Sequence, residues 1–69
     1  MQVVLNGKSQ ELPDGATVEA AVIATGAPAD GRGVAVALDG DVVPRGEWST
    51  TPVREGQLVE VLHAVQGGS

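Results

Sequence analysis

The chain ends in two adjacent glycines and a serine, Gly67-Gly68-Ser69, directly after a run of valine and leucine that predicts a strand. Glycine has no Cβ, so it costs the most to order and passes most easily through a narrow opening. Such a tail adds nothing to a core. What it offers is a carboxylate on a narrow arm, which becomes an electrophile once one of its oxygens is made a leaving group. The alternative is a frayed terminus or a linker remnant without function.

Other residues with catalytic or ligating chemistry lack the partners they would need. His63 is the single histidine, and on a strand between apolar residues it is expected to be partly buried and structural. Asp39 and Asp41 lack the rest of a calcium loop, so a solvated turn is expected. Residues 31–33, Gly-Arg-Gly, lack the third glycine of a dinucleotide fingerprint and precede a strand rather than a helix. We therefore expect no catalytic residue, no metal site and no bound cofactor.

The composition of the 69 residues excludes several classes of protein. Cysteine is absent, so the chain has no disulfide or thiol nucleophile and could not hold sulfur as a persulfide. Nine acidic and four basic residues give a net charge of −5, which argues against nucleic acid and permits a partner with a basic surface. The longest apolar runs are too short to cross a membrane, and the first residues show no signal peptide pattern. We expect a cytoplasmic, monomeric protein with one small core.

Turn signals and apolar periodicity predict a hairpin followed by a short helix. Asn6-Gly7 separates two strand-like runs and is a strong hairpin signal. Thr17 has the chemistry of an N-cap, and Gly26 supplies a left-handed stop. The residues that the helical spacing places on one face are Val18, Ala21, Val22 and Thr25.

The pattern after the helix predicts three more strands. They cover Val34–Leu38, a very short segment at 42–43 that Pro44 stops, and residues 58–65. Residues 46–52 are expected to be irregular.

This order, ββαβ(β)β, predicts an α+β fold of the ubiquitin-like β-grasp type. A mixed sheet of four to five strands would wrap around one short helix, with the first and last strands side by side and parallel in the centre. Residues 1–65 would form the β-grasp domain and residues 66–69 a flexible C-terminal tail.

Alternation along the last strand predicts which side chains lie on the face away from the helix. If Val59 and Val61 pack on the helix, the residues between them lie on the open face. That face would carry Leu58, Glu60, Leu62 and Ala64, together with Val4, Ala35 and Ala37 from other strands. An apolar surface beside an acidic group suits transient docking of a protein partner. The alternative is the scatter of single aliphatic side chains that is common on sheet surfaces.

The chain resembles the ThiS family, the ubiquitin-like sulfur carriers of thiamine biosynthesis. The resemblance covers essentially the whole length and lies in residues 1–7, 14–18, 34–38, 43–48 and 67–68. Val-Pro-Arg-x-x-Trp at 43–48 is the most family-specific part, whereas the glycine pair is shared by the whole superfamily.

The resemblance implies a carrier on which other enzymes act, and not an enzyme. In that family a partner adenylating enzyme (ThiF-like) uses ATP to convert the terminal glycine carboxylate into an acyl-adenylate. Sulfur from a donor then replaces the adenylate, and the thiocarboxylate is delivered to thiazole synthase (ThiG-like), which builds the thiazole ring of thiamine.

The resemblance also implies roles for residues of this chain. Gly68 would carry the activated group, and Gly67 and Gln66 would thread into the partner's site. The partner-binding face follows from the strand alternation rather than from the resemblance, and it would comprise Leu62, Ala64, Glu60, Leu58 and Val4.

One residue departs from the family pattern. Members of the family end at the second glycine, whereas this sequence continues to Ser69, which leaves Gly68 without a free carboxylate. Either a peptidase removes Ser69 or the serine is an addition to the native chain. Two alternatives use related chemistry: the small subunit of molybdopterin synthase, and a conjugated ubiquitin-like modifier. A tail-independent interaction module is a third.

Overall fold

The N-terminal hairpin forms around Asn6 and Gly7, whose φ angles are 52° and 83°. Two successive positive φ angles are what a two-residue type I′ turn requires, so the predicted hairpin is confirmed. In the computed structural model, which describes residues 1–28 and 30–64, β1 (Gln2–Leu5) pairs antiparallel with β2 (Lys8–Glu11).

The helix α1 (Val18–Ala24) begins where predicted but is capped differently. Thr17 has the extended backbone of an N-cap, yet its side chain makes no capping hydrogen bond. Instead, the N–H of Val18 donates to the carbonyl of Thr51 at 2.9 Å, and that of Glu19 to Trp48 at 3.1 Å. A loop far along the chain therefore satisfies the first donors of the helix.

One residue of the predicted helix face does not join the core. Val18, Ala21 and Val22 are buried. Thr25 is exposed, and its hydroxyl donates to the carbonyl of Val22 at 2.6 Å. Gly26 has a φ of 81°, which ends the helix in the left-handed conformation, as predicted.

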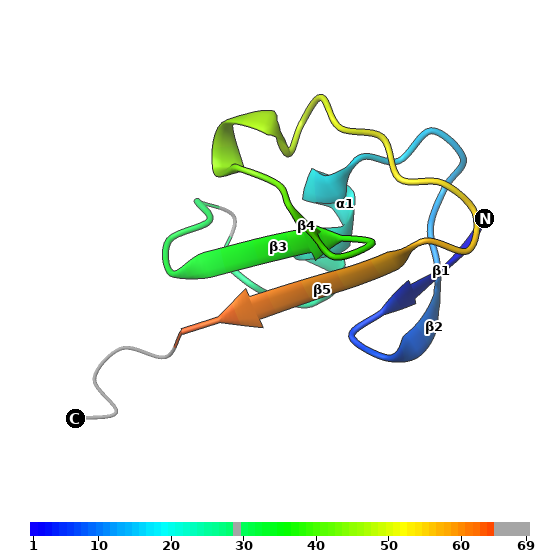
Figure 1. Ribbon diagram of the computed structural model, residues 1–69, viewed down its shortest axis with the longest axis horizontal. Coiled ribbons are helices and arrows are strands. Elements are labelled where there is room, and N and C mark those ends of the chain that lie inside the picture. The colour runs from blue at the N-terminus through cyan, green and yellow to red at the C-terminus, as the bar shows by residue number, and fades with distance from the viewer. Residues whose placement is uncertain (29, 65–69) are drawn as a thin grey trace.

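The sheet has the order β2-β1-β5-β3-β4, with β3 at Val34–Leu38, β4 at Asp41–Val42 and β5 at Leu58–His63. β1 and β5 are parallel in the middle of the sheet, and the other pairs are antiparallel. Figure 1 shows β5 running beside β3 through the centre of the molecule. The predicted β-grasp fold, a mixed sheet with one short helix, is confirmed.

Three predicted boundaries differ from the structure. β4 lies one residue earlier than predicted, although the N–H of Val43 still donates to the carbonyl of Val36 at 2.9 Å. The irregular segment begins with one turn of 3₁₀ helix, η1 (Arg45–Glu47). β5 ends at His63 and not at residue 65, which lies outside the described residues.

Valine dominates the core between α1 and the sheet. Each fully buried valine contributes about 1.5–3 kcal/mol relative to an exposed one, so many small side chains can replace a few large ones. Trp48 is the aromatic exception: its ring is buried and its indole N–H donates to the carbonyl of Val43 at 2.9 Å. The buried valines are Val3, Val18, Val22, Val36, Val43, Val53, Val59 and Val61.

Candidate functional site

The predicted tail residues Gln66, Gly67 and Gly68, with Ser69, lie outside the described residues. The structure shows what the tail is attached to. β5, the central strand, carries it, and Ala64 is the last described residue before it. The N–H of Ala64 donates to the carbonyl of Gly33 at 2.8 Å, one step beyond the Val34–His63 pair of β3 and β5.

The Asn6 side chain extends the pairing of β5 on its other edge. β1 stops at Leu5, and the Asn6 N–H donates to the carbonyl of Val59 at 2.9 Å. One residue pair further, the Asn6 amide accepts from the Val61 N–H at 2.8 Å and donates to its carbonyl at 3.2 Å. A side chain thus takes the place of a strand along the segment that leads to the tail.

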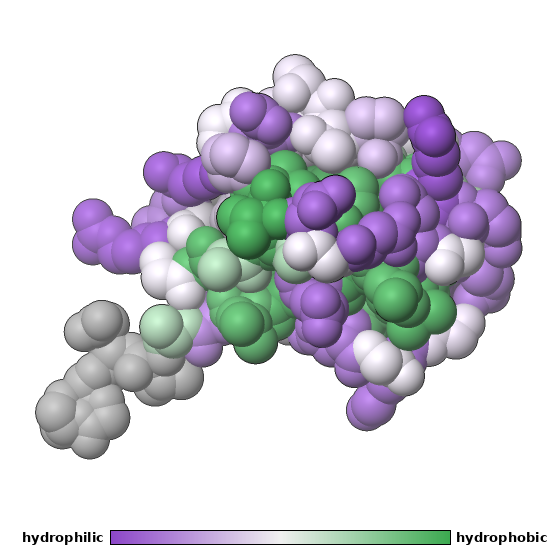
Figure 2. Space-filling view, viewed as in Figure 1, coloured by the Kyte–Doolittle hydropathy of each residue, from purple (hydrophilic) through white to green (hydrophobic). Residues whose placement is uncertain are grey.

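The open face of the sheet carries an apolar patch, which we call the sheet-face patch: Val4, Ala35, Ala37, Val42, Leu58 and Leu62. The strand registers place these residues side by side, since Val4 pairs with Leu58, Ala35 with Leu62 and Ala37 with Val42. Leu58, Leu62 and Val42 are 52%, 71% and 77% exposed. In Figure 2 apolar surface covers the region of β3, β4 and β5, interrupted and bordered by hydrophilic side chains.

The predicted docking residues therefore lie where the alternation placed them. Leu58, Glu60 and Leu62 are exposed on the open face, Val4 is half-buried there, and Ala64 is exposed just beyond β5. Val42 was missed. The Asp39-Gly40 turn is the signal that could have found it, because a two-residue hairpin loop pairs Leu38 with Asp41 and hence Ala37 with Val42.

Glu60 stands within the sheet-face patch without an ion pair among residues 1–28 and 30–64. Across those residues, the ion pairs join the Met1 amine to Glu11 at 2.8 Å and to Asp14 at 3.3 Å. The hydrogen bond that the Met1 amine donates to the Glu11 carboxylate is the main cause that raises the pKa of the amine. A partner that covers the sheet-face patch would remove water from Glu60, so it must supply a compensating donor or cation.

Asp39 does more than occupy a solvated turn. Its carboxylate accepts from the N–H of Leu58 at 2.9 Å and from the side-chain amide of Gln57 at 2.9 Å. The hydrogen bond from Leu58 is the main cause that lowers the pKa of Asp39, followed by that from Gln57. The β3–β4 turn is thereby tied to the start of β5.

His63 is exposed, which corrects the expectation that it is partly buried. Its side of β5 faces the helix layer, but β1 has ended at Leu5 and α1 at Ala24. His63 instead lines a hollow of about 190 Å³ with Asn6, Thr25, Gly26, Ala27 and Val61.

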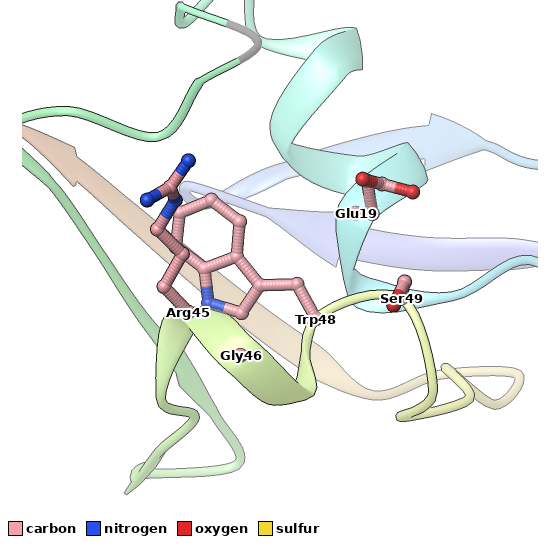
Figure 3. A pocket seen from close by; sticks show the side chains of 5 residues that line it. All are labelled: Glu19, Arg45, Gly46, Trp48 and Ser49. Atoms are coloured by element: carbon pink, nitrogen blue, oxygen red, sulfur yellow. The ribbon is translucent and has the colours of Figure 1, made fainter.

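A second hollow, of about 340 Å³, lies where α1 meets η1 (Figure 3). Its lining includes Glu19 from α1, Arg45 and Trp48, and in Figure 3 the Arg45 side chain lies along the indole ring. Within the described part of the chain, no group of three His, Asp or Glu side chains could hold a metal ion. Thr25 and His63 line the first hollow, and Ser49 and Glu19 line the second. Within the described part of the chain no hydrogen bond joins the hydroxyl to the base in either pair, and the Thr25 hydroxyl donates to Val22 instead.

The β-grasp sheet, its exposed apolar face and a glycine pair that follows the central strand define a protein of the ubiquitin-like class. The model of the ThiS family matches residues 3–68, and the chain belongs to that family. This confirms the resemblance seen in the sequence.

Two solved structures of a thiamine biosynthesis protein from Geobacter metallireducens are similar to this chain. The crystal structure, of a protein named ThiS, is 30% identical with a TM-score of 0.76, and the match covers 99% of this chain and 100% of that one. The NMR structure is 28% identical with a TM-score of 0.79, covering 100% and 90%. Among curated protein sequences none matches the chain. No described helix is long and apolar enough to span a membrane.

Proposed function

We propose that this chain is a sulfur carrier for the thiazole ring of thiamine, with Gly68 as the residue that carries the sulfur. The observation that supports this most directly is the family match, which runs through the glycine pair to residue 68. The two structures of a similar thiamine biosynthesis protein support a role in the same pathway. The chain would act as a substrate of partner enzymes rather than as an enzyme.

The chemistry follows from the carboxylate. An oxygen of the Gly68 carboxylate attacks the α-phosphorus of ATP bound to a ThiF-like adenylating enzyme, and pyrophosphate leaves. Sulfide-level sulfur (HS⁻) from a donor then attacks the acyl carbon, the bond from that carbon to the AMP oxygen breaks, AMP leaves, and a thiocarboxylate remains. A ThiG-like thiazole synthase receives that sulfur as the final acceptor.

The fold suits a carrier because docking and chemistry are separated along β5. The sheet-face patch, with Leu58 and Leu62 on β5, offers a surface for the partner enzymes. The glycine pair follows the same strand, and a residue without Cβ can enter a channel too narrow for other side chains. We propose that Gly67 and Gln66 occupy that channel while Leu62, Ala64, Glu60, Leu58 and Val4 contact the partner.

The test compares a chain that ends at Gly68 with one that ends at Ser69. Each is incubated with the adenylating enzyme, ATP and a sulfur donor, and its intact mass is measured, with a reaction lacking ATP as control. We expect the form ending at Gly68 alone to gain the mass of one oxygen exchanged for one sulfur. If that form stays unmodified the carrier proposal fails, and if the form with Ser69 is modified the assignment of Gly68 fails.

A further inference from the structure

The segment 31–33, Gly-Arg-Gly, does not fit a dinucleotide-binding pattern, but both of its glycines lie in close contact with other parts of the structure. Both of its glycines have positive φ angles, 71° at Gly31 and 73° at Gly33. Most glycines of this chain with positive φ lie in open turns, where an added Cβ would meet nothing within 4 Å. Gly31 and Gly33 differ, because each is also in close contact with another part of the molecule.

Gly31 is pressed against the family-specific Val-Pro-Arg-x-x-Trp segment. A Cβ at Gly31 would lie 2.8 Å from Cζ3 of Trp48 and 2.7 Å from Nε of Arg45. Trp48 cannot move away easily, since its ring is buried and its indole N–H is bonded to Val43. This end of the segment is therefore fixed to the core.

Gly33 contacts the base of the tail. Its carbonyl accepts the N–H of Ala64 at 2.8 Å, and a Cβ at Gly33 would lie 3.2 Å from the carbonyl oxygen of Ala64. The N–H of Val34, the first residue of β3, donates to the carbonyl of Gly31 at 3.1 Å, which closes a tight turn around residues 31–33. Contacts thus run from Trp48 through this turn to Ala64.

We infer that residues 31–33 are a positioning clamp that fixes the point at which the tail leaves the sheet. The inference that this matters for the reaction rests on the proposed function. Three residues separate Ala64 from Gly68, and the four steps from one Cα to the next reach at most about 14 Å. With Ala64 held by Gly33, the backbone of Ala64 is already fixed when the chain meets its partner.

Loss of the clamp would add the entropy cost of fixing Ala64 to the insertion of the tail into the partner. Fixing the backbone of one more residue should lower the equilibrium constant for insertion of the tail by about 5- to 30-fold. The sheet-face patch is untouched by this change, so kcat should fall while KM stays the same. Gly33 is accordingly a positioning residue and not a catalytic one.

The experiment uses the chain that ends at Gly68, its Gly33→Ala variant and a matched control, Gly15→Ala. Gly15 has a φ of 85° and open space around its Cβ position, so this control has the same unfavourable backbone angle without a contact to Ala64. A third variant, Gly33→Asn, keeps a residue that tolerates positive φ and adds the Cβ, which preserves the test if Gly33→Ala does not fold. Amide hydrogen exchange at Ala64 and adenylation kinetics are measured for each.

We expect both Gly33 variants to lose exchange protection at Ala64 while Glu60 and Leu62 stay protected, and kcat to fall about 5- to 30-fold. The Gly15→Ala control should match the parent in both measurements. The clamp is overturned if Ala64 is as protected in the Gly33 variants as in the control, or if Gly15→Ala slows adenylation equally. If the parent chain is not adenylated at all, the proposed function fails, whereas the exchange measurement still decides whether the clamp exists.

Discussion

At the scale of single residues, Asn6 meets two separate demands of the fold. Its φ of 52° suits the hairpin turn, because asparagine tolerates the left-handed region better than most residues. Its side-chain amide also bonds both backbone groups of Val61 at the point where β1 has ended. The first role is visible in the Asn-Gly dipeptide, and the second depends on where β5 lies.

Leu62 is the residue whose replacement should most directly separate docking from folding. It is 71% exposed within the sheet-face patch, so Leu62→Glu should leave the core intact, with Trp48 fluorescence unchanged. A buried charge at the centre of an interface opposes binding, and we expect kcat/KM for adenylation to fall about 30-fold, through KM.

The matched control for Leu62 is Ile23→Glu, which introduces the same group at a 58% exposed position on α1, away from the open face. It should be adenylated like the parent. Normal activity of Leu62→Glu, or equal losses in both variants, would remove Leu62 from the docking face.

At the scale of elements, the Asp39-Gly40 turn connects the edge of the sheet to its central strand. The two φ angles are 50° and 89°, the same turn geometry as in the N-terminal hairpin. The Asp39 carboxylate reaches back to the N–H of Leu58, where β5 begins. The turn therefore helps to determine where the tail-bearing strand starts.

The hydrogen bond that Asp39 accepts from the Leu58 N–H predicts how the stability of the fold depends on pH. Its pKa is lowered in the folded protein by the Leu58 N–H, so its contribution is complete above the unfolded pKa of about 4 and is lost as the pH falls through the folded pKa. The difference in free energy of unfolding between the parent and Asp39→Asn should therefore shrink below about pH 4. Urea titrations of both proteins across the acid range measure this difference.

Asp41→Asn is the control for the change in net charge, because it removes a carboxylate from the same turn without touching Leu58. A difference between parent and Asp39→Asn that stays constant or grows toward acid would show that the carboxylate of Asp39 does not hold β5.

At the scale of the whole molecule, a net negative charge accompanies the exposed apolar face of the sheet. The chain carries a net charge of −5, and Glu60 stands within the sheet-face patch. A partner complementary to this surface would be basic, and the attraction would act mainly on the rate of encounter.

Ionic strength tests that expectation. Raising it from about 0.05 M to about 0.5 M should lower the association rate constant with the adenylating enzyme by about tenfold, with little change in the dissociation rate. In stopped-flow measurements, the association rate constant of Glu60→Gln should depend less on ionic strength than that of the parent. An association rate that does not respond to salt would contradict a basic docking surface.

Much of the fold could be predicted because the signals are local. Asn6-Gly7 and Gly26 require backbone angles that few other residues adopt, and the alternation of Val34–Leu38 reflects a strand with one face in the core. The position of Leu62 on the open face followed from the same alternation, since side chains of a strand change sides at every residue. The sequence by itself thus determined the fold class, the open face and the glycine tail that follows the central strand.

Only the tertiary structure decided how distant segments complete one another. The cap of α1 comes from Thr51 and Trp48, the Asn6 amide bonds to Val61, and Gly33 holds Ala64. Each of these contacts joins residues far apart in the chain, and neither propensity nor periodicity carries information about such pairs. The exposure of His63 has the same origin, because it depends on where β1 and α1 end rather than on the residues beside it in the sequence.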